Sequence, residues 1–226
     1  MVIAKAPVAG RVKTRLCPPC TPAQAAALAE AALADTLDCV RATAAERRTL
    51  VLDGRPGPWL PDGFELIAQR EGGLDERLAG AFEDAGWPAL LVGMDTPQLT
   101  PALLSQGLEA MARDGVDAVL GAAPDGGYWA VGVRDPGVAG AGALFRGVPM
   151  SQAGTAAAQR ARLAEHGQFS HPQPVLRDVD TVADAVGVAA LAPAGRFAAA
   201  VAAAGLCGAG TRARRGVDAQ SSHREA

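Results

Sequence analysis

Short apolar runs alternate along this chain with longer stretches that are rich in alanine and leucine. Residues 89–93 form an uninterrupted apolar run, which is typical of a strand covered on both faces in a parallel sheet. Strands are also predicted at 2–4, 49–52, 64–68, 117–121 and 128–133, with a weaker strand that ends near 176. Because strands alternate with helical stretches, the pattern predicts an α/β fold, a three-layer αβα sandwich on a mostly parallel sheet.

Capping residues mark where several of the predicted helices begin. Thr21 and Gln24 have the spacing of a capping box with Pro22 at the first helical position, and the helix extends to about residue 45. Thr100 begins a helix that extends to about 113, and Ser151 is interpreted as the cap of a helix that ends near 166. Further helices are predicted at 73–85, from 181 onward and at 194–205.

The composition favours one globular domain. With 226 residues, 49% of them hydrophobic, the chain can bury a sizeable core in a single domain, which we place at 1–207. Residues 208–226 are polar, arginine-bearing and without pattern, so we expect a disordered basic tail.

The charge balance, the apolar runs and the cysteines argue against several classes of protein. Lys and Arg number 21 against 24 Asp and Glu, which argues against general nucleic-acid binding. No apolar run is as long as a membrane span, and the N-terminus lacks a signal peptide's apolar region, so we expect a cytoplasmic protein with no membrane partner. Cys17 and Cys20 have redox or metal spacing, but no second pair or nearby histidine completes a site, so the segment is interpreted as a turn.

The polar residues that stand out follow the predicted strands, in the segments 5–15, 95–97, 125–127 and 178–180. Ligands bind outside the carboxyl ends of the strands in open parallel sheets. We therefore predict that these segments lie along one edge of the sheet, and that the strands ending at Ala4, Gly93 and Gly121 are neighbours.

Segment 5–15 is strongly basic in a chain that is acidic overall, with side chains from Lys5, Arg11, Lys13 and Arg15. These bases suit phosphate oxygens, and Gly10 permits close approach of the backbone. A solvated surface loop is the alternative, although four bases in so short a segment exceed what a surface requires. The segment is not a P-loop, because Val12 stands where that motif needs glycine.

Asp95 is the first candidate ligand for a divalent cation, Mg²⁺ or Mn²⁺, because these ions prefer carboxylate oxygens together with substrate phosphates. A second carboxylate would come from Asp178 or Asp180. The alternative for Asp95 is a turn or helix cap, since Thr96 and proline follow it. The alternative is stronger for Asp180, because it directly precedes a capping threonine.

Two glycine-containing segments complete the predicted site. Gly72 and Gly73 precede a predicted helix, whose N-terminal amides would contact nucleotide or phosphate. Gly126, Gly127 and Tyr128 are predicted to shape the acceptor pocket, and Asp125, a predicted binding residue, begins the same turn.

Five blocks of this sequence resemble the DUF2064 family, which is associated with the GT-A glycosyltransferases and nucleotidyltransferases. The blocks are AKAPVAGRVKTRL at 4–16, GLDERL at 73–78, GMDTP at 93–97, DGGYW at 125–129 and RDVDT at 177–181. Superfamily relatives include the molybdenum-cofactor and phospholactate guanylyltransferases. The resemblance covers roughly 1–190 and implies a GT-A sheet, a metal aspartate at Asp95, a phosphate loop at 5–15 and a substrate loop at 125–129. Cys17 and Cys20 depart from the family, which usually places small or apolar residues there.

These residues favour nucleotidyl transfer from a nucleoside triphosphate to a small acceptor that bears a phosphate or a hydroxyl. Lys13 and Arg15 would stabilise the departing pyrophosphate, and Asp95 would hold the metal. Glycosyl transfer from a nucleotide-sugar donor is the alternative, although the four bases exceed what a diphosphate needs. A nucleotide-binding protein without catalytic turnover is the third possibility.

Overall fold

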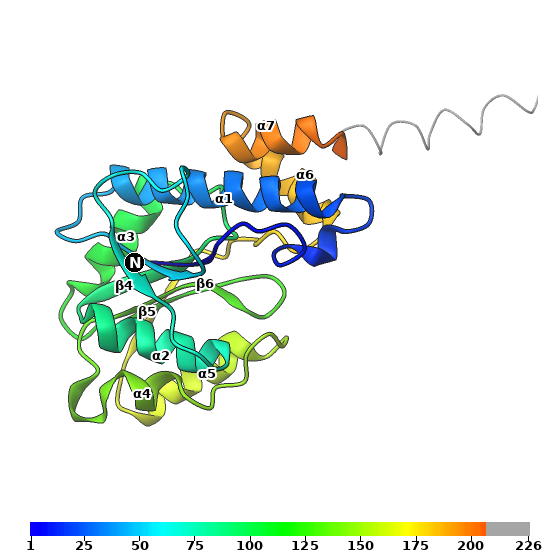
Figure 1. The fold of residues 1–226 in the computed structure, drawn as a ribbon. Helices are drawn as coiled ribbons and strands as arrows, with labels where there is room; N and C mark the ends of the chain where they lie inside the picture. Colours follow the sequence, from blue (N-terminus) through cyan, green and yellow to red (C-terminus); the bar gives the residue numbers. More distant parts are fainter. Residues whose placement is uncertain (207–226) are drawn as a thin grey trace, which may run out of the picture.

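Strands and helices alternate along residues 1–206, which are the residues that the computed structural model describes (Figure 1). The strands are β1 (Val2–Lys5), β2 (Thr49–Asp53), β3 (Glu65–Ala68), β4 (Ala89–Gly93), β5 (Ala118–Ala122), β6 (Tyr128–Val133) and β7 (Ser170–Gln173). The α-helices are α1 (Pro22–Ala42), α2 (Leu74–Ala85), α3 (Pro101–Met111), α4 (Gly140–Phe145), α5 (Thr155–Glu165), α6 (Val182–Leu191) and α7 (Arg196–Ala203). Two 3₁₀ turns are η1 (Thr14–Leu16) and η2 (Gly137–Ala139). The predicted tail at 208–226 lies outside the described residues.

Within residues 1–206 the sheet has seven strands in the order β3-β2-β1-β4-β6-β5-β7. All neighbours pair in parallel except β6, which runs antiparallel to both β4 and β5. The predicted mostly parallel sheet is therefore confirmed, but β4 and β5 are not neighbours as predicted, because β6 lies between them. The reason is the connection 123–127, which is too short for a parallel crossover and therefore makes a hairpin. Since two reversals restore the direction, β5 still ends at the same edge as β1 and β4.

Helices cover both faces of the sheet, which confirms the three-layer sandwich (Figure 1). On one face, α1 and α3 pack over a buried cluster that includes Leu37, Val92 and Trp129. On the other, α2, α4 and α5 lie over a second cluster, in which the rings of Phe82 and Phe145 stack with centroids 4.9 Å apart.

A third buried cluster joins the end of the first loop to α1, α6 and α7. Leu16 in η1 and Val179 before α6 both belong to it, although they lie 163 positions apart in the sequence. Burying these two residues in one cluster brings the basic segment 5–15 and the acidic segment 178–180 to the same place. Cys20 is also buried in this cluster, which agrees with a structural role for the segment around it.

Three of the four predicted capping residues are confirmed. Thr21 and Thr181 form capping boxes, and Thr100 accepts a hydrogen bond from the Leu103 amide. Ser151 does not cap a helix, because α5 begins at Thr155 with Gly154 as its cap. The helix α4 was not predicted, since its two glycines give neither a cap signal nor an apolar period.

Candidate functional site

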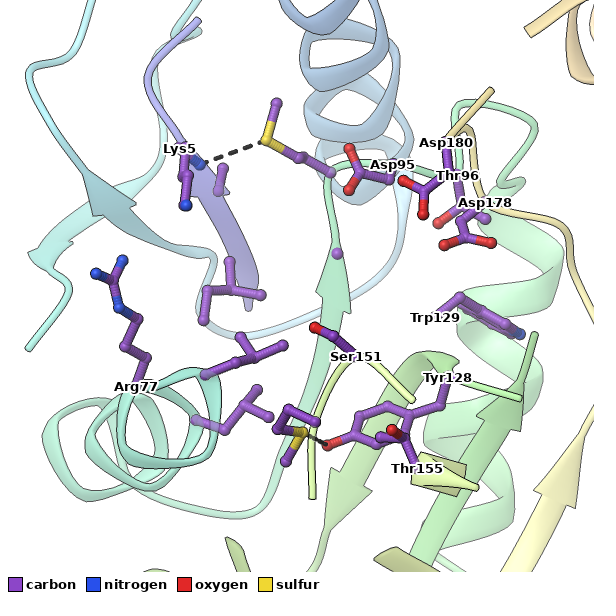
Figure 2. A pocket seen from close by; sticks show the side chains of 18 of the residues that line it. Lys5, Arg77, Asp95, Thr96, Tyr128, Trp129, Ser151, Thr155, Asp178 and Asp180 are labelled. Atoms are coloured by element: carbon purple, nitrogen blue, oxygen red, sulfur yellow. Dashed lines mark hydrogen bonds between the residues drawn. The ribbon is translucent and has the colours of Figure 1, made fainter. Parts of the chain in front are cut away.

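The loops at the carboxyl edge of the sheet surround a cavity of about 720 Å³ (Figure 2). The prediction that segments 5–15, 95–97, 125–127 and 178–180 gather at one edge agrees with this arrangement, because all four contribute to its lining. The predicted site residues that line it are Lys5, Arg11, Lys13, Arg15, Gly72, Asp95, Asp125, Gly127, Tyr128, Asp178 and Asp180. Gly10, Gly73 and Gly126 are not in the lining.

Lys13 is the cation at the centre of the charged side chains. Its Nζ lies 2.8 Å from Asp95 Oδ1 and 3.6 Å from Asp180 Oδ1, and it donates a hydrogen bond to the Val179 carbonyl. The side chain is only 9% exposed, although lysine is strongly hydrated when free. Its backbone is left-handed, with φ 47°, a conformation that is uncommon for a residue with a side chain and recurs at functional sites.

Asp95 follows β4 and is held by its own backbone. Its carbonyl accepts a hydrogen bond of 2.9 Å from the Val179 amide, which joins the end of β4 to the segment before α6. Its Oδ1 is buried and makes no hydrogen bond within residues 1–206, so Lys13 is an ionic partner only. Thr100 caps α3 instead, so the geometry does not favour the cap interpretation of Asp95.

Three other carboxylates form a compact group. Asp125, Asp178 and Asp180 each offer an oxygen within 4.8 Å of the other two. The pKa of Asp178 is raised to about 6, mainly by burial and also by the charges of Asp125 and Asp180, while a backbone hydrogen bond and the charge of Lys13 act in the opposite direction. Arg15 donates to Asp180 Oδ2 at 3.0 Å.

The predicted ligand set is therefore divided in space. Asp95 and Asp180 share the Lys13 ammonium, whereas Asp125 joins Asp178 and Asp180. Asp125 is predicted from the sequence as part of the substrate loop, and not as a metal ligand. Its position directly after β5, like that of Asp95 after β4, was the available signal.

Gly126 makes the turn after β5 possible without lining the cavity. Its φ is +91°, and a Cβ at this position would lie 1.8 Å from the carbonyl oxygen of Ala153. Its own carbonyl accepts a hydrogen bond of 2.8 Å from the Ala156 amide. The turn that carries Asp125 is therefore pressed directly against the loop that leads into α5.

A hydrogen-bonded network at the ends of β2 and β3 was missed in the sequence. Arg77 donates to Asp53 Oδ2 at 2.8 Å, to Gln69 Oε1 at 3.0 Å and to the Gly72 carbonyl at 3.1 Å. The Arg77 hydrogen bond is the main cause that holds the pKa of Asp53 below its usual value, and the charges of Lys5 and Arg11 add to it. Asp53 ends β2 as Asp95 follows β4, so the strand-end rule could have found it.

Gly72 and Gly73 hold the approach to α2. Gly72 has a φ of +108°, and Gly73 is the N-terminal cap of the helix. Of the two, only Gly72 lines the cavity.

Tyr128 begins β6 at the same edge and points away from the carboxylates (Figure 2). Its hydroxyl donates to Gln159 Oε1 at 3.2 Å and lies 3.9 Å from the Met150 sulfur. Gln159 is fully buried and donates to the Leu144 carbonyl at 2.8 Å. Tyr128 is thus fixed by packing and hydrogen bonding, and burial raises its pKa.

A family model described as "Uncharacterized protein conserved in bacteria (DUF2064)" matches residues 23–152. The matched region holds the blocks at 73–78, 93–97 and 125–129, and it omits the basic segment and 177–181. No curated protein matches the chain.

Two solved structures share the fold. One, from Desulfovibrio desulfuricans G20, is provisionally assigned as a nucleotide-diphospho-sugar transferase; it is 23% identical, with 90% of this chain and 96% of that chain covered and a TM-score of 0.73. The other is a CMP:2-keto-3-deoxy-manno-octonic acid synthetase complexed with CTP, 13% identical, with 86% of this chain and 98% of that chain covered and a TM-score of 0.53. At these identities the likeness establishes the sheet and its layers. Within residues 1–206, no helix combines the length and apolar character needed to cross a bilayer.

Proposed function

The chain belongs to the DUF2064 family, and we propose that it is a transferase that moves a nucleotidyl group from a nucleoside triphosphate to a small acceptor. The observation that carries this proposal is the meeting of Lys13 with Asp95 and Asp180 at the carboxyl edge of the sheet. Basic side chains suited to phosphates face the same cavity as carboxylates suited to a metal ion. The synthetase complexed with CTP has the same fold and a nucleoside triphosphate as its ligand.

The donor's phosphates would lie against the basic side chains of the lining. Lys5 and Arg11 make no ion pair within residues 1–206, so their charges are available to a ligand. Lys13 and Arg15 would bind the two phosphates that leave. In the transfer, an acceptor oxygen forms a bond to the α-phosphorus, the bond to the bridging oxygen breaks, and pyrophosphate leaves with that electron pair. The proton of the acceptor hydroxyl passes to solvent.

The carboxylates fit a divalent cation such as Mg²⁺ or Mn²⁺. Asp125, Asp178 and Asp180 are a hard oxygen donor set, and Asp95 is linked to this group through the Lys13 ammonium, which lies 2.8 Å from Asp95 Oδ1 and 3.6 Å from Asp180 Oδ1. When bound there, the cation would neutralise charge on the donor phosphates. Lys13 supplies positive charge to Asp95 and Asp180 in the protein alone, which reduces the repulsion among the acidic side chains.

Glycosyl transfer is the second candidate. The structure of highest TM-score reported above carries a provisional assignment as a nucleotide-diphospho-sugar transferase. A nucleotide sugar would place its diphosphate on the same cations and carboxylates. The two reactions differ in how many phosphates the basic segment must bind.

The test is to incubate the protein with Mg²⁺ and each of the four nucleoside triphosphates or a panel of nucleotide sugars. A ligand of the folded state raises the melting temperature, so thermal shift ranks the donors, and calorimetry then compares the tri-, di- and monophosphate forms. We expect the triphosphate to bind most tightly. Equal binding of diphosphate and triphosphate would move the assignment to glycosyl transfer. Tight binding with no turnover across an acceptor panel would favour a nucleotide-binding protein without catalysis.

A further inference from the structure

One part of the cavity lining, away from the carboxylates and from the basic side chains of Lys5, Arg11 and Arg77, carries no charged side chain. We call it the neutral wall, and its main residues are Leu74, Leu78, Tyr128, Met150, Ser151 and Gln152. They come from the first turns of α2, the start of β6 and the loop 149–154. Figure 2 places Ser151, Tyr128 and Thr155 together, apart from Asp95, Asp178 and Asp180 and from Lys5 and Arg77.

The basic residues behind the neutral wall are turned away from the cavity and engaged elsewhere. Arg146 pairs with Glu76 at 2.8 Å and with Glu83 at 2.9 Å. Arg162 donates to the carbonyl of Arg146 at 2.7 Å and pairs with Glu165 at 3.4 Å. Neither arginine lines the cavity. Arg77 does line the cavity, one position before Leu78, but its guanidinium pairs with Asp53 at 2.8 Å. Within residues 1–206 the neutral wall therefore offers an anionic ligand no unpaired cation.

A negative charge also lies behind the neutral wall. The carboxylate of Asp75 accepts a hydrogen bond of 2.9 Å from the Gly147 amide, and its charge adds to the burial that raises the pKa of Tyr128. Asp125 stands at the junction with the carboxylate group. An anion bound against the neutral wall would contact apolar side chains and lie near the charges of Asp75 and Asp125, both of which disfavour it.

Ser151 supplies the neutral wall with a hydrogen-bonding group. Its backbone has φ 57°, which is sparsely populated for a residue with a side chain and is often found at ligand-binding loops. Its hydroxyl points into the cavity and makes no hydrogen bond within residues 1–206 (Figure 2). The loop is held by the Gln152 amide, which donates to Thr155 Oγ1 at 3.1 Å, and by the contact of Ala153 with Gly126.

We infer, on the basis of the proposed transfer, that the neutral wall binds the acceptor and that this acceptor is an uncharged hydroxyl compound such as a polyol or a sugar. A phosphate monoester or a carboxylate would find no counter-charge there. Ser151 would accept or donate a hydrogen bond to one acceptor hydroxyl, while Leu74, Leu78 and Met150 contact its carbon skeleton. The sequence left open whether the acceptor bears a phosphate or a hydroxyl, and this inference selects the hydroxyl compound.

Matched pairs of acceptors test the inference, for example glycerol with glycerol 3-phosphate and glucose with glucose 6-phosphate. Pyrophosphate release is measured at fixed donor and Mg²⁺, and we expect kcat/KM to be at least about tenfold higher for the uncharged member of a reactive pair. A faster reaction of the phosphorylated member overturns the inference. If the wild-type protein binds no nucleotide in calorimetry, the proposed function fails first, so the two failures are distinguishable.

A binding measurement keeps the test independent of the true acceptor. The protein is saturated with a nonhydrolysable triphosphate and Mg²⁺, so that the basic segment is occupied, and inorganic phosphate is then titrated. We expect no phosphate binding in the wild type and millimolar or tighter binding in Ser151→Lys, because that variant adds the missing cation. Ala157→Lys, at an exposed position of α5, is the matched control and should behave as the wild type. Phosphate binding by the loaded wild type, or none by Ser151→Lys when it still binds donor, overturns the inference.

Discussion

The two sides of the cavity are lined by different kinds of side chain, charged on one side and uncharged on the other. The charged side carries Lys13 and the four carboxylates of Asp95, Asp125, Asp178 and Asp180, in segments far apart in the sequence. The neutral wall carries leucine, methionine, tyrosine and serine side chains. Like charges held close together repel one another, and Lys13 compensates those of Asp95 and Asp180, whereas the neutral wall needs only a fixed shape.

This difference teaches how each side is stabilised. The charged side is pinned by buried residues beneath it, because Leu16 and Val179 lie in one cluster and the Val179 amide bonds to the Asp95 carbonyl. The neutral wall is held from behind by the hydrogen bond that its Tyr128 donates to Gln159, and from the side by the Gly126 turn. Substitutions should therefore separate donor binding from acceptor binding.

The largest effect is expected for Asp95→Asn. Asparagine keeps the volume but removes the charge that pairs with Lys13, so transition-state stabilisation should fall by about 3 kcal/mol while the fold persists. Initial rates at saturating donor and a urea unfolding curve measure both quantities. Asp62→Asn, at an exposed loop position, is the control. Activity within a few-fold of wild type would show that Asp95 has only a structural role.

Removing two cations should weaken donor binding by nearly as much free energy. In the double variant Lys13→Met, Arg15→Met, each lost charge-assisted contact removes about 1.5 kcal/mol from triphosphate binding, and monophosphate binding should change far less. The difference should shrink at high salt, because screening also weakens the wild type. Calorimetry with the three phosphate forms decides this, with Arg41→Met on the exposed surface of α1 as the control. An equal loss for diphosphate and triphosphate would argue against nucleotidyl transfer.

The charged side could be predicted from the sequence because its residues are unusual for their surroundings. Four bases in a short segment of an acidic chain, and aspartates directly after apolar strands, stand out in one dimension. What could not be predicted was which carboxylates meet, since Asp125 joins Asp178 and Asp180 only because β5 and β6 form a hairpin. That pairing depends on strand order, which the apolar pattern does not encode.

The neutral wall could not be predicted because its leucine, methionine and tyrosine side chains are of kinds that also fill protein cores. Leu78 and Met150 have the same character whether they face the interior or a cavity, and only packing distinguishes the two. Ser151 was interpreted as a helix cap because serine is common there, and its left-handed backbone has no sequence signal. The fold could be predicted more completely than the site, since the periods of strands and helices are repeated over many residues.

Gly126→Ala should disturb the contact between the turn that carries Asp125 and the loop that carries Ser151. The new Cβ would meet the Ala153 carbonyl, and φ +91° is strained for alanine, so the free energy of unfolding should fall by about 2 kcal/mol. Gly10→Ala is the matched control, because Gly10 has φ +77° but open space around its Cβ, and it should lose about 1 kcal/mol. Urea unfolding compares the two variants. Equal losses would mean that the contact with Ala153 is unimportant.

The smallest predicted effect concerns Lys13 alone, and its sign separates two roles of one side chain. The Lys13 ammonium lies 2.8 Å from Asp95 and 3.6 Å from Asp180, so it shares oxygens that would attract a divalent cation. In the absence of nucleotide, Lys13→Met removes this competing charge, and Mn²⁺ affinity should rise by about 1 kcal/mol. The same variant should bind triphosphate more weakly, because the cation that faces the phosphates is gone. Calorimetric titration with Mn²⁺ alone and with nucleotide alone measures both signs, and Arg41→Met should change neither. If Mn²⁺ affinity falls together with nucleotide affinity, Lys13 organises the carboxylates for the metal and does not compete with it.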